Sequence, residues 1–341
     1  MKKRFLAFAA MLLFTLAGCG QPTQDTQSAE TPSPSASEPA QQEVTPGYEN
    51  GLVTRVASLK GPTSMGLASL MTEDNEHYEF TMYAAADEIA PLIAKGEVDI
   101  ALIPANLAAT LYQKTNGAIE VININTLSVL EVVTPGDVQM EDLSELKGKT
   151  IYMTGKGTTP EASLRYLLEK NNLSWDDVKV EFKTEATEVV SALSTDNQAF
   201  AVLPQPFATV ATQQLENRHI ALSLGDEWTR VSDNGSELVT GVTIARKEFA
   251  EEHPAAMLQF ASDALDSVNY VNGHPEDAAK RIESLDIVKA AIAERAIPRC
   301  NLVSLTGEDM RTALSGYLDA LYTYDAGLVG GKLPEEDFYA V

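Results

Sequence analysis

The sequence predicts an α/β protein in which two similar lobes face each other across a cleft. Strand and helix patterns alternate along the chain, and the alternation restarts near residue 150. The chain has 341 residues, of which 44% are hydrophobic and 22% charged, as in an ordinary globular protein of two-domain size. Segment 98–104 is apolar on both faces, as a buried parallel strand is. Because ligands bind at the carboxyl ends of strands in open parallel sheets, we look for function in the loops there.

The charge and the cysteine count exclude several classes of protein. The chain has 25 Lys and Arg against 49 Asp and Glu, a formal net charge of −24, which would repel nucleic acid. Its two cysteines, Cys19 and Cys300, are too few for a disulfide framework or a cysteine-based metal cage. We therefore expect no nucleic-acid partner, no metal and no cofactor.

The first 47 residues predict export and a membrane anchor. Residues 1–18 read as a signal peptide, since a basic start is followed by an apolar run too short to remain a membrane span. This run ends in Leu-Ala-Gly-Cys, which resembles the lipobox where bacterial lipoproteins are cleaved and lipidated at the cysteine, here Cys19. The alternative is a cleaved signal in which Cys19 is incidental. Residues 19–47 are then the lipidated cysteine and a polar, Pro- and Ser-rich tether.

The expected elements of the body follow from the periodicity of apolar residues and from Gly and Pro breaks. In the first half, strands and helices alternate in the order 52–59, 64–72, 78–83, 88–95, 98–104, 106–113, 119–125 and 130–133. The second half repeats this order with 150–154, 161–170, 178–182, 187–193 and 200–203. Strand 238–245 follows, and the tail from residue 248 is almost wholly helical and packs on the first half.

This repetition predicts the domain boundaries. Lobe 1 comprises residues 48–128 plus 239–341, and lobe 2 comprises residues 129–238. The chain crosses between the lobes near residues 126–130 and 238–241, which form the hinge of a cleft that closes on its ligand.

Two glycine-containing loops run from a strand end into a helix start and would present backbone N–H groups and hydroxyls to the cleft. One supplies Lys60, Gly61, Thr63, Ser64 and Met65, and the other supplies Thr158 and Thr159. A helix N-terminus can hold a small anion without a cationic side chain. The alternative is that Ser64, Thr158 and Thr159 only cap helices. Neither loop ends in the Gly-Lys-Ser/Thr of a phosphate-binding P-loop.

Other candidates at strand ends could form hydrogen bonds or stacking contacts with a ligand. They are Asn106, Asn125, Glu185, Gln205, Phe207 and Trp228. Four of them have a plain structural alternative: Asn106 as a helix cap, Glu185 as a solvated first-turn acid, and the two aromatic residues as core.

Residues suited to catalysis are scarce. The histidines His77, His219, His253 and His274 are scattered without metal-ligand spacing, and no Gly-x-Ser-x-Gly elbow occurs. Cys300 reads as a buried small hydrophobic residue without a histidine beside it. The sequence thus predicts a protein that is not an enzyme.

Four segments resemble bacterial ABC-transporter substrate-binding lipoproteins of the nitrate, sulfonate and taurine group, which also includes thiamine-pyrimidine binders. They are Leu-Lys-Gly-Pro-Thr at 59–63, Gly-Glu-Val-Asp-Ile-Ala at 96–101 with Pro-Ala-Asn at 104–106, Asp-Leu-Ser-Glu-Leu-Lys-Gly-Lys at 142–149, and Arg-Lys-Glu-Phe-Ala-Glu-Glu-His-Pro at 246–254. The resemblance covers essentially the whole mature chain. It implies a periplasmic-binding-protein-like fold with two α/β lobes, a hinge and a central cleft.

The resemblance also implies a function. A monomer anchored through lipid on Cys19 at the outer face of the membrane captures a solute and passes it to an ABC permease and its cytoplasmic ATPase. Gly20 follows the cysteine in place of the Asp that retains lipoproteins at an inner membrane, which favours a single-membrane cell. A small organic anion such as a sulfonate, taurine or nitrate would be held by Thr63, Ser64, Thr158 and Thr159. The alternative ligand is a thiamine-precursor pyrimidine or another aromatic molecule, which would need Phe207, Trp228 and Glu185. An enzyme on the same fold and a surface adhesin are competing classes.

Overall fold

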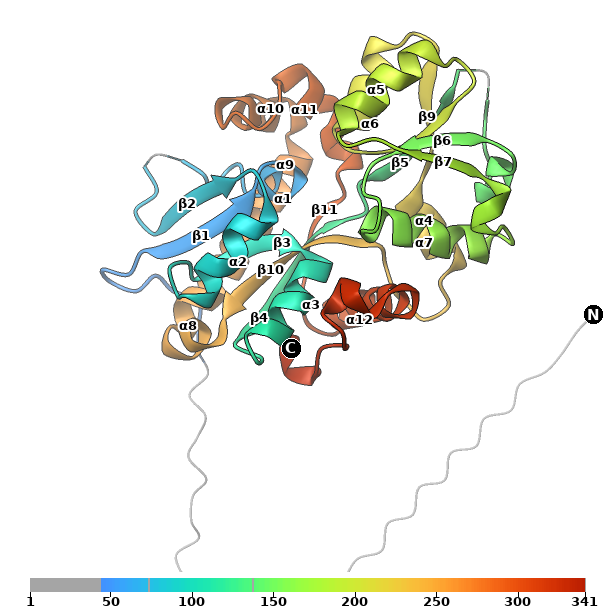
Figure 1. The fold of residues 1–341 in the computed structure, drawn as a ribbon. Helices are drawn as coiled ribbons and strands as arrows, with labels where there is room; N and C mark the ends of the chain where they lie inside the picture. The colour runs from blue at the N-terminus through green and yellow to red at the C-terminus, as the bar shows by residue number, and fades with distance from the viewer. Residues whose placement is uncertain (1–43, 73, 137, 341) are drawn as a thin grey trace, which may run out of the picture. The chain divides into compact units, whose positions relative to one another are not determined.

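The computed structural model describes residues 44–72, 74–136 and 138–340, and Val44–Val341 forms one compact unit. The predicted signal peptide, Cys19 and most of the tether lie outside the described residues. Eleven strands in this part of the chain form a six-stranded and a five-stranded sheet, with helices packed around each (Figure 1). None of the described helices is long and apolar enough to cross a membrane.

The six-stranded sheet is built mainly from the first part of the chain. Its strand order is β11-β4-β10-β3-β1-β2. The strands are β1 (Thr54–Leu59), β2 (Tyr78–Tyr83), β3 (Ile100–Pro104), β4 (Ile119–Leu127), β10 (Val239–Arg246) and β11 (Leu302–Leu305). Strand β1 runs parallel to β2 and β3, whereas β10 is antiparallel to β3 and β4. Two later segments thus complete a sheet that the first 127 residues begin.

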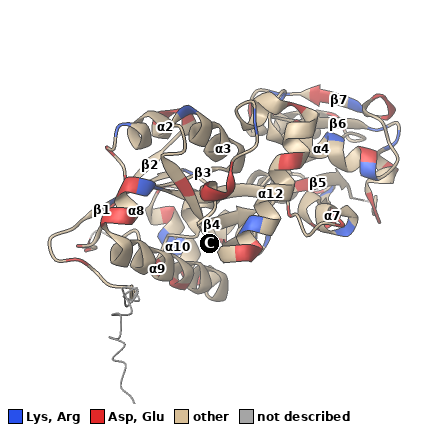
Figure 2. Ribbon diagram, turned by 90° about the horizontal axis from the view of Figure 1, so that it is seen from below, with Lys and Arg blue, Asp and Glu red and all other residues tan. Residues whose placement is uncertain are grey.

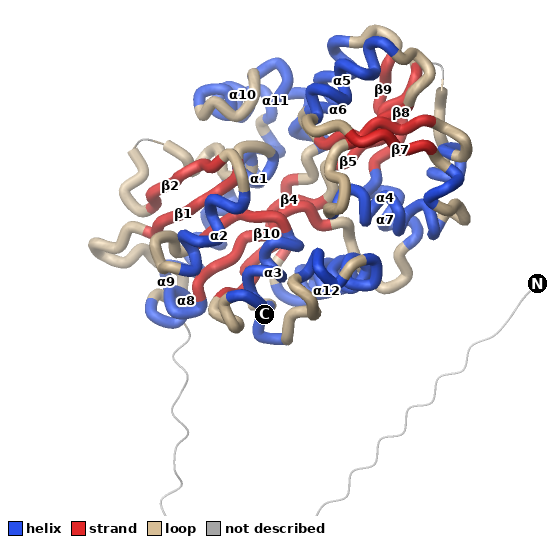
Figure 3. The backbone as a smooth tube through the Cα atoms, in the orientation of Figure 1, coloured by secondary structure: helices blue, strands red, loops and turns tan. Residues whose placement is uncertain are grey.

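The five-stranded sheet comes from one continuous stretch of chain and has the order β7-β6-β8-β5-β9. Its strands are β5 (Leu130–Pro135), β6 (Thr150–Met153), β7 (Lys179–Phe182), β8 (Phe200–Pro204) and β9 (Arg218–Ser223). Strand β6 is parallel to β7 and β8, and β5 is antiparallel to β8 and β9. Figure 3 shows the strands as two separate groups, with helices outside both.

The chain crosses from the first sheet to the second between β4 and β5, at residues 128–129. It returns between α7 (Leu224–Val231) and β10. The architecture is therefore a two-lobed α/β fold with two crossings. The division into residues 48–128 plus 239–341 and residues 129–238 stays a prediction, as does movement at the crossings.

The other helices cover both sheets. They are α1 (Pro62–Met65), α2 (Ala86–Ala94), α3 (Ala105–Lys114), α4 (Thr159–Lys170), α5 (Ala186–Thr195), α6 (Phe207–Gln214), α8 (Lys247–Glu252), α9 (Pro254–Gly273), α10 (Pro275–Ser284), α11 (Ala290–Ala296) and α12 (Gly307–Tyr324). The tail helix α12 contacts α3, β4 and β10 of the first lobe and also α4 of the second. The tail therefore packs on the first half, as the sequence predicted, and in addition on α4 of the second lobe.

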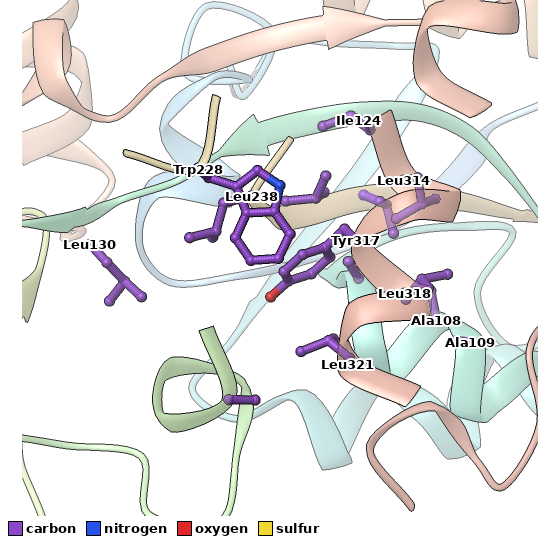
Figure 4. Packing of buried hydrophobic residues seen from close by; sticks show 14 of the residues in the cluster. Ala108, Ala109, Ile124, Leu130, Trp228, Leu238, Leu314, Tyr317, Leu318 and Leu321 are labelled. Atoms are coloured by element: carbon purple, nitrogen blue, oxygen red, sulfur yellow. The ribbon is translucent and has the colours of Figure 1, made fainter. Parts of the chain in front are cut away.

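The largest core cluster includes residues of both lobes and of the tail. Trp228 of α7 is fully buried, stacks on Tyr166 with ring centroids 4.3 Å apart, and meets Tyr317 of α12 edge to face at 5.4 Å. Figure 4 shows Trp228 and Tyr317 packed beside Leu238, with leucines of α12 around them. This aromatic stack joins the tail helix to the second lobe.

The structure differs in detail from the sequence predictions at three places, although β3 is a parallel strand and the tail is mostly helical as expected. Both sheets are mixed rather than parallel, because β5 and β10 each enter a sheet from the other lobe without a helical crossover. The helix expected over 64–72 ends at Met65 and continues as turns, in which Leu67 and Ala68 donate to the carbonyls of the third residue before them. The nearly all-helical tail contains β11, an edge strand too short to show a clear pattern.

Candidate functional site

A cavity of about 270 Å³ lies between the two sheets, where strand ends of both lobes meet. From the first lobe it is lined by Leu59, Lys60, Gly61, Pro62, Thr63 and Pro104. From the second lobe it is lined by Thr154, Thr159, Pro160, Ser163 and Pro204. The remaining lining comes from the crossings and the tail, namely Val129, Leu130, Leu238, Thr240 and Tyr317. We refer to this cavity as the cleft.

Local sequence explains why these loops open toward the cleft. Gly61 has a φ of +141°, a backbone conformation that side-chain-bearing residues rarely adopt, and Pro62 follows it at the start of α1. Proline also stands at the ends of β3 and β8 and in the first turn of α4. The prolines end β3 and β8 at fixed positions, and after each strand the chain turns into a helix.

Gly241 lets β10 pack closely against both Asn125 of β4 and the loop that contains Thr63. A Cβ atom on Gly241 would lie 2.6 Å from Asn125 Oδ1 and 2.7 Å from Thr63 Cγ2. Only glycine leaves room for both side chains at this place. Asn125 itself faces its neighbours in the sheet, donating to Thr243 Oγ1 at 3.1 Å and accepting from Thr126 Oγ1 at 2.8 Å.

The lining is uncharged apart from one residue. Lys60 Nζ lies 2.7 Å from Asp286 Oδ2, and both side chains are exposed, so this cation is held at the rim. Four threonines, Ser163 and Tyr317 supply hydroxyls, and Leu59, Val129, Leu130 and Leu238 supply apolar walls. No carboxylate, histidine or cysteine is among the lining residues. The cleft therefore offers hydrogen-bond donors beside an apolar surface.

Two hydroxyls lie at the buried end of the cleft. Ser163 is 1% exposed, and its Oγ atom has no hydrogen-bond partner among the described residues. Burial raises the pKa of Tyr317 to about 12, while the neighbouring hydroxyls of Ser163 and Thr159 act in the opposite direction. Tyr317 is therefore a protonated hydrogen-bond donor at neutral pH.

The structure brings only some of the predicted site residues to the cleft. Lys60, Gly61, Thr63 and Thr159 line it. Ser64 and Met65 are fully buried beneath the loop, where Ser64 Oγ donates to Ser58 Oγ at 2.6 Å. Thr158 is exposed outside the lining and donates to the carbonyl of Gly155 at 2.6 Å.

The other predicted residues lie outside the lining. Glu185 is exposed just before α5, and Asn106 is half-buried in the first turn of α3. Phe207 packs against a core cluster of the second lobe. Trp228 is buried behind Tyr317 and donates from Nε1 to Ser236 Oγ at 3.0 Å, so it presents no face to the cleft. Its position corrects the expectation that it could stack on a ligand.

The sequence missed Thr154, Ser163, Thr240 and Tyr317. Thr154 and Ser163 stand either side of a loop that was singled out, so counting further into α4 could have found Ser163. Tyr317 lies more than 150 residues away in a helix whose pattern resembles that of any amphipathic helix. No sequence signal places it beside α4.

A second buried polar cluster lies on the opposite side of β5. Glu131 follows the cleft residue Leu130, and successive strand side chains point to opposite faces. Glu131 is 2% exposed, and its Oε1 atom lies 3.3 Å from Arg299 Nη1 and 3.5 Å from Gln205 Nε2. Its Oε2 atom has no partner among the described residues. Burial raises the pKa of Glu131 to about 7, although Arg299 partly opposes this.

Cys300 and Gln205 complete this second cluster. Gln205 is 2% exposed and accepts from Thr209 Oγ1 at 2.7 Å, so its predicted contact with a ligand is replaced by contacts inside the protein. Cys300 is fully buried, as the sequence indicated. Burial, followed by the Glu131 charge, raises the pKa of its thiol to about 12, which leaves it protonated and unreactive.

A larger groove of about 410 Å³ lies between α4 and α12 and carries charges of both signs. Its Arg165 guanidinium lies 2.7 Å from Glu161 and stacks over Trp175 at 3.8 Å. The positive charge of Arg165 is therefore already paired within the protein. Figure 2 shows that charged residues are distributed over surface helices and loops of both lobes. The cleft differs from this groove because its lining has no acidic residue and a single cation, Lys60, at the rim.

Comparison with known proteins decides the family. The model of the family described as NMT1/THI5 like matches residues 79–278, more than half of the chain. The chain belongs to the NMT1/THI5-like family. No curated protein matches it in sequence.

Solved structures show the same fold. An ABC transporter protein from Parabacteroides distasonis is 23% identical, with a TM-score of 0.71 over 85% of this chain and 99% of that chain. The periplasmic aliphatic sulphonate binding protein SsuA from Escherichia coli is 13% identical, with a TM-score of 0.68 over 85% and 92%. The desulfurization enzyme DSZB is 12% identical, with a TM-score of 0.59 over 84% and 96%. This family member therefore has a fold that binding proteins and an enzyme share.

Proposed function

We propose that this chain is the solute-binding component of an ABC-type importer and captures a small organic anion of the sulfonate kind in the cleft. It would then deliver the anion to a membrane permease driven by a cytoplasmic ATPase. The family, and the predominance of ABC-transporter and sulfonate-binding proteins among its structural neighbours, support the class.

The observation that carries this proposal is the hydroxyl-lined cleft between the two sheets, in which Lys60 at the rim is the one charged lining residue. The N-terminus of α4 begins at Thr159 inside the lining, and a helix N-terminus attracts negative charge. The walls formed by Leu59, Leu130 and Leu238 suit a short aliphatic body. A volume of about 270 Å³ admits a ligand of only a few heavy atoms.

The proposal includes an extracytoplasmic location. Cys19, after a signal peptide at residues 1–18, would carry the lipid, and the polar segment up to residue 47 would tether a monomeric body to the membrane of a single-membrane cell. Mass spectrometry of the protein recovered from membranes tests this. Acylation of Cys19 is expected, and a free thiol at that position would contradict it.

Neither the alternative ligand nor an enzyme finds its expected side chains in the cleft. A pyrimidine binder was expected to use Phe207, Trp228 and Glu185. The two aromatic side chains pack in the core, and Glu185 lies on the surface. The enzyme among the structural neighbours shows that this fold can support catalysis. The lining of this cleft, however, provides no carboxylate, imidazole or thiol to act as a general base or nucleophile. Binding without reaction is the better account of these residues.

A thermal-shift screen of the purified protein tests the proposal. The probes are methanesulfonate, ethanesulfonate, taurine, nitrate, acetate and 4-aminopyrimidine. A ligand at a hundred times its Kd stabilises the folded state by about 2.7 kcal/mol, so a sulfonate is expected to raise the Tm clearly. A flat response to all anions, or a response to the pyrimidine alone, would contradict the proposed ligand class.

A pair of variants assigns any response to a cavity. Thr240→Trp fills the cleft, and Thr323→Trp places the same side chain in the larger groove beside α12. We expect the shift caused by a sulfonate to disappear in Thr240→Trp and to persist in Thr323→Trp. The reverse pattern would move the binding site to the groove.

A further inference from the structure

Ser163 has an unsatisfied hydrogen-bonding group at the end of the cleft. It lies in the second turn of α4, is 1% exposed, and its Oγ atom has no partner among the described residues. A serine inside a helix ordinarily bonds back to the carbonyl four residues earlier, here that of Thr159, but this bond is not formed. The neighbouring Tyr317 hydroxyl interacts with Ser163 Oγ without forming a regular hydrogen bond. Since buried hydroxyls are nearly always paired, Ser163 is open to an external partner.

Tyr317 brings a second donor to the same place from a different part of the chain. It is 2% exposed, lines the cleft from α12, and its hydroxyl lies near those of Ser163 and Thr159. Its ring is held edge to face against Trp228 (Figure 4). Trp228 is itself stacked on Tyr166. The hydroxyl is thus positioned before any ligand arrives, which reduces the entropy that binding must overcome.

We propose that Ser163 and Tyr317 are specificity-determining donors that together bind an oxygen of the ligand's anionic group at the N-terminal end of α4. The assignment rests on the proposed function and names the side chains that recognise the head group. Thr159 completes this donor set from the first turn of the same helix.

The arrangement has a consequence for selectivity. The two donors face the cleft without a carboxylate among the lining residues, and the one cation, Lys60, is paired with Asp286 at the rim. A ligand that offers an oxygen acceptor satisfies the buried donors, whereas an ammonium group leaves them unpaired and gains no counter-charge. The donors also come from α4 and α12, so a bound anion links the second lobe to the tail helix.

Isothermal titration calorimetry with methanesulfonate, ethanesulfonate, nitrate and acetate tests this assignment. Ser163→Ala and Tyr317→Phe each remove one hydroxyl and little else. We expect each variant to weaken binding of the tightest probe about ten- to a hundredfold, the usual effect of losing a hydrogen bond to a charged group. Ser194→Ala on α5 and Tyr322→Phe on α12 remove exposed hydroxyls and are the matched controls, with unchanged affinity expected.

Stability without ligand separates recognition from a structural role. Removing an unpaired buried hydroxyl should leave the Tm of ligand-free Ser163→Ala equal to or above that of wild type. A lower Tm together with unchanged affinity would show a structural role and overturn the assignment. Unchanged affinity in both Ser163→Ala and Tyr317→Phe would overturn it while leaving the proposed function intact. A wild-type protein that binds none of the four anions would overturn both.

Discussion

The two faces of strand β5 carry buried polar clusters of opposite character. The cleft side, next to Leu130, has hydroxyls and no buried charge, whereas the side of Glu131 has a carboxylate paired with Arg299 and Gln205. One cluster is left open to a cavity, whereas in the other the protein's own side chains pair Glu131 Oε1 and leave Oε2 without a partner among the described residues. Neighbouring positions in one strand thus separate a hydroxyl-lined cavity from a buried, partly paired carboxylate.

The packing that supports the cleft is expected to contribute most to stability. Trp228→Ala removes a fully buried ring from between Tyr166 and Tyr317 and should destabilise the protein by about 3–5 kcal/mol. Urea unfolding measures this loss. Trp175→Ala, at a partly buried ring, is the control and should cost clearly less. Equal losses would mean that the aromatic stack does not support the cleft in particular.

The charged cluster predicts a pH dependence that the cleft lacks. The pKa of Glu131 is raised from about 4.5 to about 7, so its contribution to stability is full below pH 4.5 and is lost as the pH rises through 7. This change amounts to about 3 kcal/mol at most. Glu131→Gln keeps the shape without the charge and should raise the Tm at pH 8 while changing it little at pH 4.5.

The control for this prediction is Glu181→Gln, at an exposed position on β7. It should follow the wild-type Tm at both pH values. If Glu131→Gln shows the same fall in Tm between pH 4.5 and 8 as wild type, the pH dependence comes from other groups.

Arg299, the ion-pair partner of Glu131, gives a second prediction about pH-dependent stability. Arg299 favours the charged form of Glu131, so Arg299→Gln should raise the pKa of that carboxyl and move the pH window of lost stability upward. Because the Arg299 side chain is about half exposed, we expect the free energy of unfolding at pH 8 to fall by at most about 1 kcal/mol. Thermal unfolding from pH 5 to 9 measures this change. A pH window that moves downward in Arg299→Gln would contradict the pairing of Arg299 with Glu131.

The smallest expected effect concerns the Cys300 thiol. Its raised pKa and complete burial predict that a thiol reagent such as dithionitrobenzoate reacts with it only when the protein unfolds. The measured reaction rate should therefore follow denaturant concentration. Rapid modification under native conditions would show that the Glu131 cluster opens to solvent.

Sequence patterns with clear periodicity were interpreted correctly, and those set by distant contacts were not. Strand 78–83 matches β2, and residues 150–154 and 200–203 differ from β6 and β8 by one residue at the end. Strand β9 and helices α6 and α7 were not predicted, because the apolar faces of these short elements follow no long run. For the site, the loop containing Lys60, Gly61 and Thr63 was found because a glycine and a proline mark it.

The rest of the site could not be predicted for a physical reason. Trp228 and Tyr317 are both aromatic and both on helices, yet one lies in the core and the other lines the cleft. Burial of a helix side chain depends on which neighbour covers it. Trp228 of α7 is covered by Tyr317 of α12, from a distant part of the chain. The same holds for Glu131, which as a strand acid would ordinarily be taken as solvent-facing.

The sequence by itself determined the α/β alternation, the restart near residue 150 and the glycine- and proline-marked loops at strand ends, since these depend on local backbone preferences and on periodicity. Only the tertiary structure decided which hydroxyls meet in the cleft, which carboxylate is buried and which aromatic ring supports Tyr317. The physical reason is that burial and hydrogen-bond satisfaction are properties of contacts between distant segments, here β5, α4, α7 and α12.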